Sequence, residues 1–211
     1  DNKVNNANGQ YVYMAIRRPD SYVGKLPEVG TECFAMDVGN SSAPGPAFDS
    51  GFPVDMVLHQ KPASAGLNWR LTTRYDQLRK NSIPGLTAET DENENYLDYN
   101  DGFGRTYDTL WQSWMWKRNA GFDVQLFQGT AHDPSNGYRH GLGQVPEFKM
   151  LKRTNQAYNW IGTGTIVSQA MVGTNNAKDY YLSWGNNDLA NNSSNYWGGN
   201  DTKDFFTVRG G

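Results

Sequence analysis

The feature that most constrains this chain is a short segment of one kind that occurs twice. Residues 11–18 read "YVYMAIRR" and residues 111–118 read "WQSWMWKR". Each begins with an aromatic residue, continues through an apolar stretch and ends in two cations. Similar segments in corresponding places are typical of an internal repeat, in which each copy folds as one unit. In a strand, both faces of each segment would be largely apolar, which is typical of a central strand buried on both faces.

Further features recur in the same order along the chain. They are the alternating segments 33–39 and 123–129, each closed by glycine; the segments 51–60 and 143–153, each with a proline just before a strand pattern; the Asn-Trp pairs at 68–69 and 159–160; and the Asn-Tyr pairs at 95–96 and 195–196. Proline is tolerated at the first residue of a strand, where its missing N–H costs least. This alignment places Trp69 and Trp160 at matching positions of two related units.

The phase of the repeat defines the expected domains. Residues 1–18 are a closing strand of a preceding or swapped unit, 19–118 a first β-sandwich module, and 119–211 a second module without its own closing strand. Either residues 11–18 close the second module, or the chain is a piece of a longer array, and we favour the longer array. An unclosed module would expose a row of backbone N–H and C=O groups that a neighbouring repeat or subunit would cover.

Composition supports a folded, all-β chain. Aromatic residues make up 13% and charged residues only 19% of the sequence, which argues against disorder. The best helical candidate, residues 68–80, carries alternating Leu71, Thr73 and Tyr75 and suits a strand equally well. Many short strands with polar turns indicate sandwiches. We therefore expect two tandem jelly-roll-type antiparallel β-sandwiches.

Charge and hydropathy narrow the expected partners. The formal net charge of -3 provides no general attraction to nucleic acid or to an anionic membrane. No apolar stretch approaches the roughly 18 residues that indicate a membrane span. We therefore expect neither nucleic-acid binding nor membrane insertion.

The tryptophans of the second closing segment have two interpretations. In a strand, Trp114 and Trp116 share one face with Gln112. They could be interior residues or a platform on which a sugar stacks. We favour the interior, because the matching residues of the first copy are Met14 and Ile16, which do not stack on sugars.

The chain also resembles a known module. The segments "GFDVQLFQGT", "HGLGQVPEFKMLKR", "NW", "YYLSWG", "NYW" and "FFTV", with the junction "YDTLWQSWMWKRNAGFDV" before them, resemble a recurring module of structural proteins of marine tailed phages. That module is similar to concanavalin-like, LamG-type jelly-roll sandwiches. Residues 156–176 depart from its pattern by being longer and richer in Gly and Thr. The resemblance implies a non-enzymatic fibre or capsid-decoration protein, and it carries over no catalytic residue.

Aromatic and amide side chains in the loops are the candidates for carbohydrate binding. They are Trp197, Asn195, Asn200, Asp201, Tyr138 and Trp184. Trp197 precedes Gly198-Gly199 in a polar loop and is the best single candidate. A large aromatic residue in such a loop is covered by a partner or used for binding. Ligand binding and burial against another protein both fit.

The densest acidic stretch, residues 90–101, suggests a calcium site in the first copy only. Its candidate ligands are Asp91, Asn93, Asp98 and Asp101. An EF-hand is excluded, because Tyr96 stands where glycine is needed and Gly102 where glutamate is needed. A looser site of loop carboxylates stays open.

Other chemistry has weaker support. His132, Asp133 and His140 match no zinc spacing, and Cys33 fits a small buried residue better than a nucleophile. A glycan hydrolase would have to use Glu89 together with the acidic residues of the same loop. The catalytic carboxylates of glycosidases flank a cleft and do not lie together in one polar loop, so a hydrolase is disfavoured.

These observations lead to one expectation about function. The chain is a non-enzymatic component of a virion surface that assembles with other virion proteins or copies of itself, with host attachment through a glycan as a further role. The rival is a secreted lectin-like module of a marine bacterium that binds carbohydrate through Trp197 and the Asn-rich loops.

Overall fold

Strands make up almost all of the regular structure of this protein. The computed structural model describes residues 29–41, 45–64, 66–83, 87–129, 137–164, 180–184, 191–192 and 201–208. Within these ranges the only helical element is the 3-10 turn η1 (Gly30–Glu32), and every strand pairing is antiparallel. The expected all-β fold is therefore confirmed. None of the described helical structure is long and apolar enough to cross a membrane.

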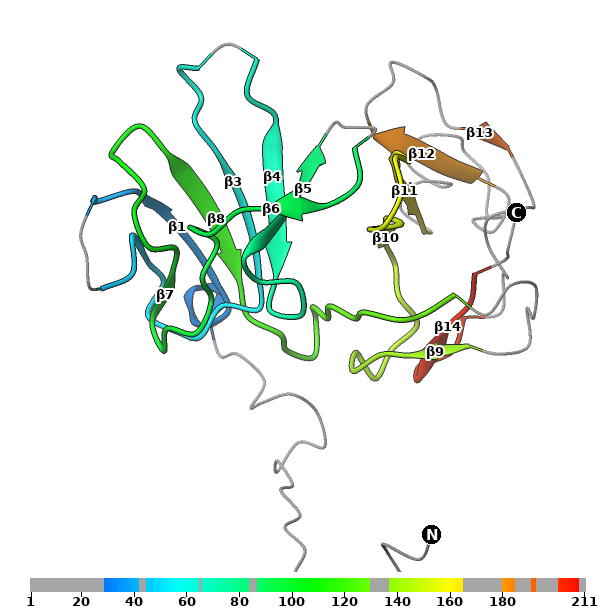
Figure 1. Cartoon of the computed structure of the whole chain (residues 1–211). Coiled ribbons are helices and arrows are strands. Elements are labelled where there is room, and N and C mark those ends of the chain that lie inside the picture. Colours follow the sequence, from blue (N-terminus) through cyan, green and yellow to red (C-terminus); the bar gives the residue numbers. More distant parts are fainter. Residues whose placement is uncertain are drawn as a thin grey trace, which may run out of the picture.

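The larger sheet has six strands in the order β1-β8-β3-β4-β5-β6 (Figure 1). These strands are β1 (Phe34–Val38), β8 (Gln112–Trp116), β3 (Met56–Gln60), β4 (Trp69–Thr73), β5 (Arg79–Ile83) and β6 (Thr90–Asp91). The helical candidate at residues 68–80 is thus β4, a turn and the start of β5. Its β-branched threonines and alternating leucine fit a pleated surface better than a helix.

One face of this sheet packs against a small second layer. The layer is the antiparallel pair of two short strands that are distant in the sequence, β2 (Phe48–Asp49) and β7 (Gly102–Phe103). Because side chains alternate along a strand, Val57 and Met115 point to this face and are fully buried. They contact a cluster that includes Phe48, Phe103 and Tyr107, whose rings pack against one another. This is the principal apolar core.

A buried polar network lies inside that core. The Asn95 amide donates to the Thr72 hydroxyl at 2.6 Å and to the Arg79 carbonyl at 2.8 Å, and it accepts from the Tyr107 hydroxyl at 2.6 Å. The His59 ring nitrogen Nε2 lies 3.4 Å from the same hydroxyl. Burial raises the pKa of Tyr107, so its hydroxyl stays a donor. Burial, followed by the charges of Arg70 and Lys80, holds the pKa of His59 well below 6.5.

The second half of the chain forms two smaller sheets (Figure 1). One has the order β10-β11-β12-β13, and the other pairs β14 with β9. The strands are β9 (Tyr138–Arg139), β10 (Lys149–Leu151), β11 (Trp160–Thr163), β12 (Tyr180–Trp184), β13 (Asn191–Asn192) and β14 (Phe205–Phe206). Like β3 to β6, the strands β10 to β13 pair in chain order.

Several details of the first half recur in the second. Trp69 and Trp160 are the first residues of β4 and β11, each the second strand of an antiparallel hairpin. Three residues later, the Thr72 hydroxyl donates to the Arg79 carbonyl at 2.7 Å and the Thr163 hydroxyl to that of Tyr180 at 2.5 Å. In both cases the acceptor is the first residue of the next strand. These facts support the expected alignment, while the duplication and the jelly-roll topology stay predictions.

The small strand pairs also correspond. Phe48 of β2 lies opposite Phe103 of β7, with ring centroids 5.7 Å apart. Tyr138 of β9 lies opposite Phe206 of β14, with centroids 5.6 Å apart. Each pair thus brings two aromatic rings together across an antiparallel ladder.

A second apolar cluster joins the two halves. Leu71 and Ile83 of the first half are buried with Trp160 of the second, and Met150 and Trp184 pack against them. The Trp160 indole N–H donates to the Ser82 carbonyl at 3.3 Å. The larger sheet is therefore covered on both faces over β4 and β5.

One expected strand is absent. Residues 123–129 were predicted to form a strand matching β1, and the structure shows no regular element there, so this prediction is wrong. The physical reason lies in the pairing. Among the described strands β1 pairs only with β8, and no described strand takes the place of β8 in the second half. A strand without a partner leaves its backbone groups unpaired, so alternation alone does not stabilise one.

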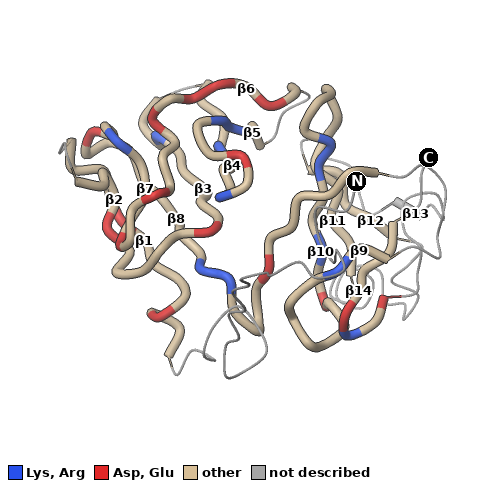
Figure 2. Tube along the Cα trace, turned by 60° about the horizontal axis from the view of Figure 1, so that its bottom comes forward, with Lys and Arg blue, Asp and Glu red and all other residues tan. Residues whose placement is uncertain are grey.

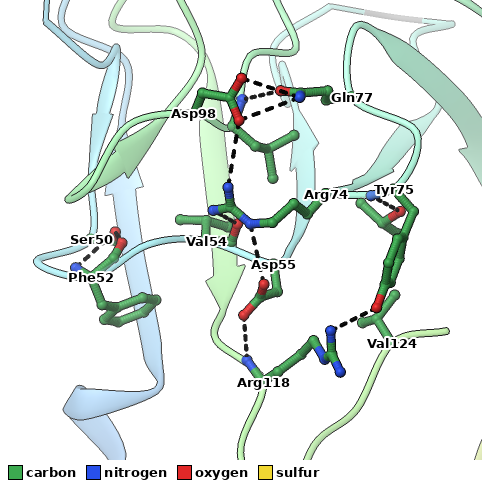
Figure 3. Close-up of polar contacts among 12 residues, drawn as sticks. Ser50, Phe52, Val54, Asp55, Arg74, Tyr75, Gln77, Asp98, Arg118 and Val124 are labelled. Carbon is green, nitrogen blue, oxygen red and sulfur yellow. Dashed lines mark hydrogen bonds and ion pairs between the residues drawn. The ribbon is translucent and has the colours of Figure 1, made fainter. Parts of the chain in front are cut away.

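The junction between the halves is held by ionic contacts (Figure 3). The Asp55 carboxylate accepts from the Arg74 guanidinium at 3.2 Å and from the backbone N–H of Arg118 at 2.8 Å. The Arg118 guanidinium in turn pairs with Asp123 at 2.7 Å and donates to the Tyr75 hydroxyl. These contacts hold Arg118, the last residue of the closing segment 111–118, in place where the chain passes to the second half.

The buried imidazole makes stability depend on pH. A histidine kept neutral by the fold has a lower pKa in the folded than in the unfolded chain, so the unfolded chain binds more protons below pH 6.5. We expect the free energy of unfolding to fall as the pH drops from about 7 to about 5, and His59→Leu to flatten this slope. Denaturant unfolding at several pH values measures it. An equal slope in both proteins would contradict the assignment.

Candidate functional site: an open sheet edge

The open edge is β1. Among the described strands only β8 pairs with β1, so its other side carries unpaired backbone groups. Natural edge strands are usually protected by lysine, proline, a bulge or a covering segment. Here the outward-facing side chains are those of Met36 and Val38, and these two residues are 64% and 50% exposed. Asp37 points to the other face, where its carboxylate accepts the backbone N–H of Asp49 at 2.7 Å.

This edge ends an apolar row that crosses four strands. The pairings Met36↔Trp114, Trp114↔Leu58 and Leu58↔Leu71 place these four side chains on one face. The Trp114 ring also packs on that of Trp69, with centroids 4.1 Å apart. The second half covers the row at Leu71 and leaves it open at Met36. We name the open end, Phe34, Met36, Val38 and Trp114, the β1 patch.

A second edge strand among the described strands is β10. It is the first strand of its sheet and pairs only with β11 among the described strands. Phe148, just before it, is 41% exposed. Lys149 forms an ion pair with Asp201, and burial lowers the pKa of Lys149 while that carboxylate opposes the shift. Lys149, the first residue of β10, is therefore anchored by a charged partner.

The predicted carbohydrate residues are mostly engaged inside the protein. Trp184 ends β12 and packs in the cluster between the halves. Tyr138 packs on Phe127, with ring centroids 4.0 Å apart. Asp201 is held by Lys149 and by the backbone and hydroxyl of Thr207. Trp197, Asn195 and Asn200 lie outside the described residues, so their part in a site stays a prediction.

The predicted calcium ligands contact different partners and do not converge on one point. Asp91 pairs with Arg79 at 3.4 Å, and Asp98 contacts Arg74 at 3.7 Å and the Gln77 amide. The Asp101 carbonyl accepts backbone N–H groups of the β2 end at residues 50 and 51. Within the described part of the chain no three acidic, histidine or cysteine side chains gather as a metal site. Asn93 lies in the turn between them.

Trp114 and Trp116 are half-buried on the face away from the principal core. Met115 and Ser113, on the opposite face of β8, are the fully buried residues of this strand. Trp116 packs on Phe34, with centroids 5.1 Å apart. Trp114 and Trp116 share one face of β8, as predicted from the sequence. Their rings pack against Trp69 and Phe34 on the apolar face away from the principal core.

The β1 patch was not selected from the sequence. The signal was present, since "FAMDV" has apolar residues at alternating positions and a single acid between them. Alternation alone does not reveal that β1 is an edge strand, because sheet order depends on pairing between distant segments.

Charge does not single out another site. Figure 2 shows acidic and basic residues distributed over both halves of the described chain. Comparisons with family models, with curated proteins and with solved structures give no match. The open edge of β1 is therefore the feature of the described residues that points most directly to a partner.

The Asn-Tyr pairs at 95–96 and 195–196 allow a test of whether Asn195 binds sugar or has the structural role of Asn95. Asn95 is buried and makes three side-chain hydrogen bonds that hold β4, β5 and Tyr107 together. We expect Asn95→Ala to cost about 2–3 kcal/mol, because buried partners lose their hydrogen bonds. If the repeat holds, Asn195→Ala will be similarly destabilising.

Chemical denaturation of the two variants beside wild type measures this. Asn93→Ala, in the same acidic loop as Asn95, is the control and is expected to stay within about 0.5 kcal/mol of wild type. A stable Asn195→Ala protein with lost glycan binding would instead support the lectin interpretation.

Proposed function

We propose that this protein is a non-enzymatic structural module of a particle surface, whose copies or partner proteins assemble through the β1 patch. The observation that carries the proposal is the open edge of β1, with Met36 and Val38 exposed beside half-buried aromatic rings. The resemblance to virion modules of marine tailed phages supports a fibre or capsid-decoration role.

An apolar sheet edge is costly to leave open to solvent. An unprotected edge invites pairing with another strand, and an exposed apolar row adds a favourable burial term. Burying a Met or Val side chain fully contributes about 1.5–3 kcal/mol. Edge pairing would add backbone hydrogen bonds, which give affinity, while the alternate side chains give specificity. A protein partner uses both the backbone edge and the apolar row.

Sugar stacking is less well supported by the described residues. Trp114 already packs on Trp69, and the polar side chain nearest the exposed rings on β1, Asp37, is turned to the other face. A carbohydrate site needs polar groups that fix the orientation of the ring. Lectin-like binding through Trp197 remains an alternative outcome.

Charged substitutions at the edge test assembly. We expect Met36→Lys with Val38→Lys to weaken self-association or partner binding at least ~10-fold, because a charge would have to be buried at the interface. Analytical ultracentrifugation over a range of concentrations measures self-association, and images of the native particle locate the edge.

Leu126→Lys is the matched control, since Leu126 is 59% exposed on a segment outside the β1 patch. Unchanged assembly by the double variant, or glycan binding that Trp197→Ala abolishes, would refute the proposal.

A further inference from the structure

We propose that two copies of this chain pair through β1, antiparallel and about a two-fold axis at Met36, so that their six-stranded sheets join into one. This inference rests on the proposed function, because it names a second copy as the partner of the β1 patch. An interface of this kind uses the same surface on both molecules.

The hydrogen bonds between β1 and β8 show which backbone groups of β1 are already used. At one end of the ladder the Lys117 N–H donates to the Cys33 carbonyl at 2.9 Å. At the other end the Gly39 N–H donates to the Trp111 carbonyl at 3.0 Å. Bonded pairs alternate along an antiparallel ladder, so β1 bonds β8 through its odd-numbered residues.

The even-numbered residues Phe34, Met36 and Val38 therefore direct their N–H and C=O groups to the open side. The next residue of this series shows the direction, since the Asn40 N–H donates to the Ala47 carbonyl at 3.1 Å. Within β1 itself, no described backbone group bonds this side. A partner strand thus meets a regular row of donors and acceptors.

A two-fold axis at Met36 uses this whole row. Met36 then lies opposite Met36 of the second copy, and Phe34 lies opposite Val38 of the second copy. Outward-bonding residues face outward-bonding residues throughout, so each pair exchanges both hydrogen bonds. The side chains fit as well, because an aromatic ring beside a β-branched residue is a favourable cross-strand pair and methionine adapts to its neighbours.

Charge distinguishes this register from the adjacent ones. The one charged residue of β1 is Asp37, whose carboxylate accepts the Asp49 N–H at 2.7 Å on the other face. An axis at Asp37 would place two carboxylates directly opposite each other, which destabilises a strand pair. An axis at Ala35 would place Val38 beyond the end of the partner strand. The axis at Met36 sets Asp37 opposite Ala35 and overlaps the two strands over their full length.

The composition of the edge favours a second copy as its partner. The exposed face of β1 is uncharged, so nothing on it selects a partner of opposite charge. A second β1 supplies a matching row of backbone groups, an apolar face and a register without charge conflict. Joining the sheets leaves neither copy with an open side at β1, so association through this edge closes at a dimer.

Cysteine cross-linking tests the position of the axis. In a Cys33→Ser background, Met36→Cys should form a disulfide between two copies on mild oxidation, because directly opposed residues lie within bonding range. The matched control is Val38→Cys, on the same face and also exposed. Val38 of the second copy would lie roughly 13 Å further along the strand, so the control should cross-link at least ~10-fold more slowly. Mixing the Phe34→Cys and Val38→Cys proteins should restore cross-linking.

Hydrogen exchange at single-residue resolution tests the backbone pairing without substitution. We expect the Met36 amide to exchange at least ~10-fold more slowly at concentrations where ultracentrifugation shows a dimer than at dilution. The Ala35 and Asp37 amides bond β8 in either state and should change little. Residues 11–18, the predicted closing strand, lie outside the described residues. Protection of Met36 that does not depend on concentration would indicate a segment of the same chain and overturn the pairing.

The outcomes separate this inference from the proposed function. A monomer at every concentration, or equal cross-linking of Met36→Cys and Val38→Cys, would overturn the two-fold pairing. If Met36→Lys with Val38→Lys then still weakens binding to another protein of the particle, the proposed function holds and only the second copy is wrong. If that double variant assembles as wild type does, both are wrong.

Discussion

The structure depends on one central strand. β8 pairs with β1 on one side and β3 on the other, so it joins segments that are far apart in the sequence. Its inward residue Met115 fills the principal core, and its outward residues Trp114 and Trp116 hold the other face through Trp69 and Phe34. A strand buried on both faces must be apolar at successive positions, which is the pattern that made this segment conspicuous.

The same strand explains where prediction from the sequence succeeded. Alternation correctly located β1, β3, β8 and β10, because the side-chain period is a local property. The matching of Trp69 with Trp160 also rests on local order, and both residues begin the second strand of a hairpin. The sequence could not reveal which strands are edges, nor that residues 123–129 are not a strand, since both depend on a partner elsewhere.

The candidate site was the less predictable part. Loop aromatics and carboxylates were selected because such residues often bind ligands, but Trp184 and Tyr138 serve packing, and Asp98 and Asp201 serve ion pairs. A polar side chain in a loop can bind a ligand, form an ion pair or hydrogen-bond the backbone, and the residues that surround it in the fold determine which of these it does. Asn95 shows the converse, because an amide in an acidic loop is the centre of a buried network.

The edge strands β1 and β10 differ in a way that bears on assembly. The β1 edge presents apolar side chains with no charge on the exposed face, whereas the β10 edge is followed by Lys152 and Arg153 and preceded by Glu147. Charges at the ends of a strand restrict which segment can pair in register, and they disfavour promiscuous pairing. The charges around β10 therefore disfavour promiscuous pairing, whereas the β1 edge suits a broad apolar surface. An association that uses the β1 edge alone has a single direction, which favours limited assembly over an unrestricted fibre.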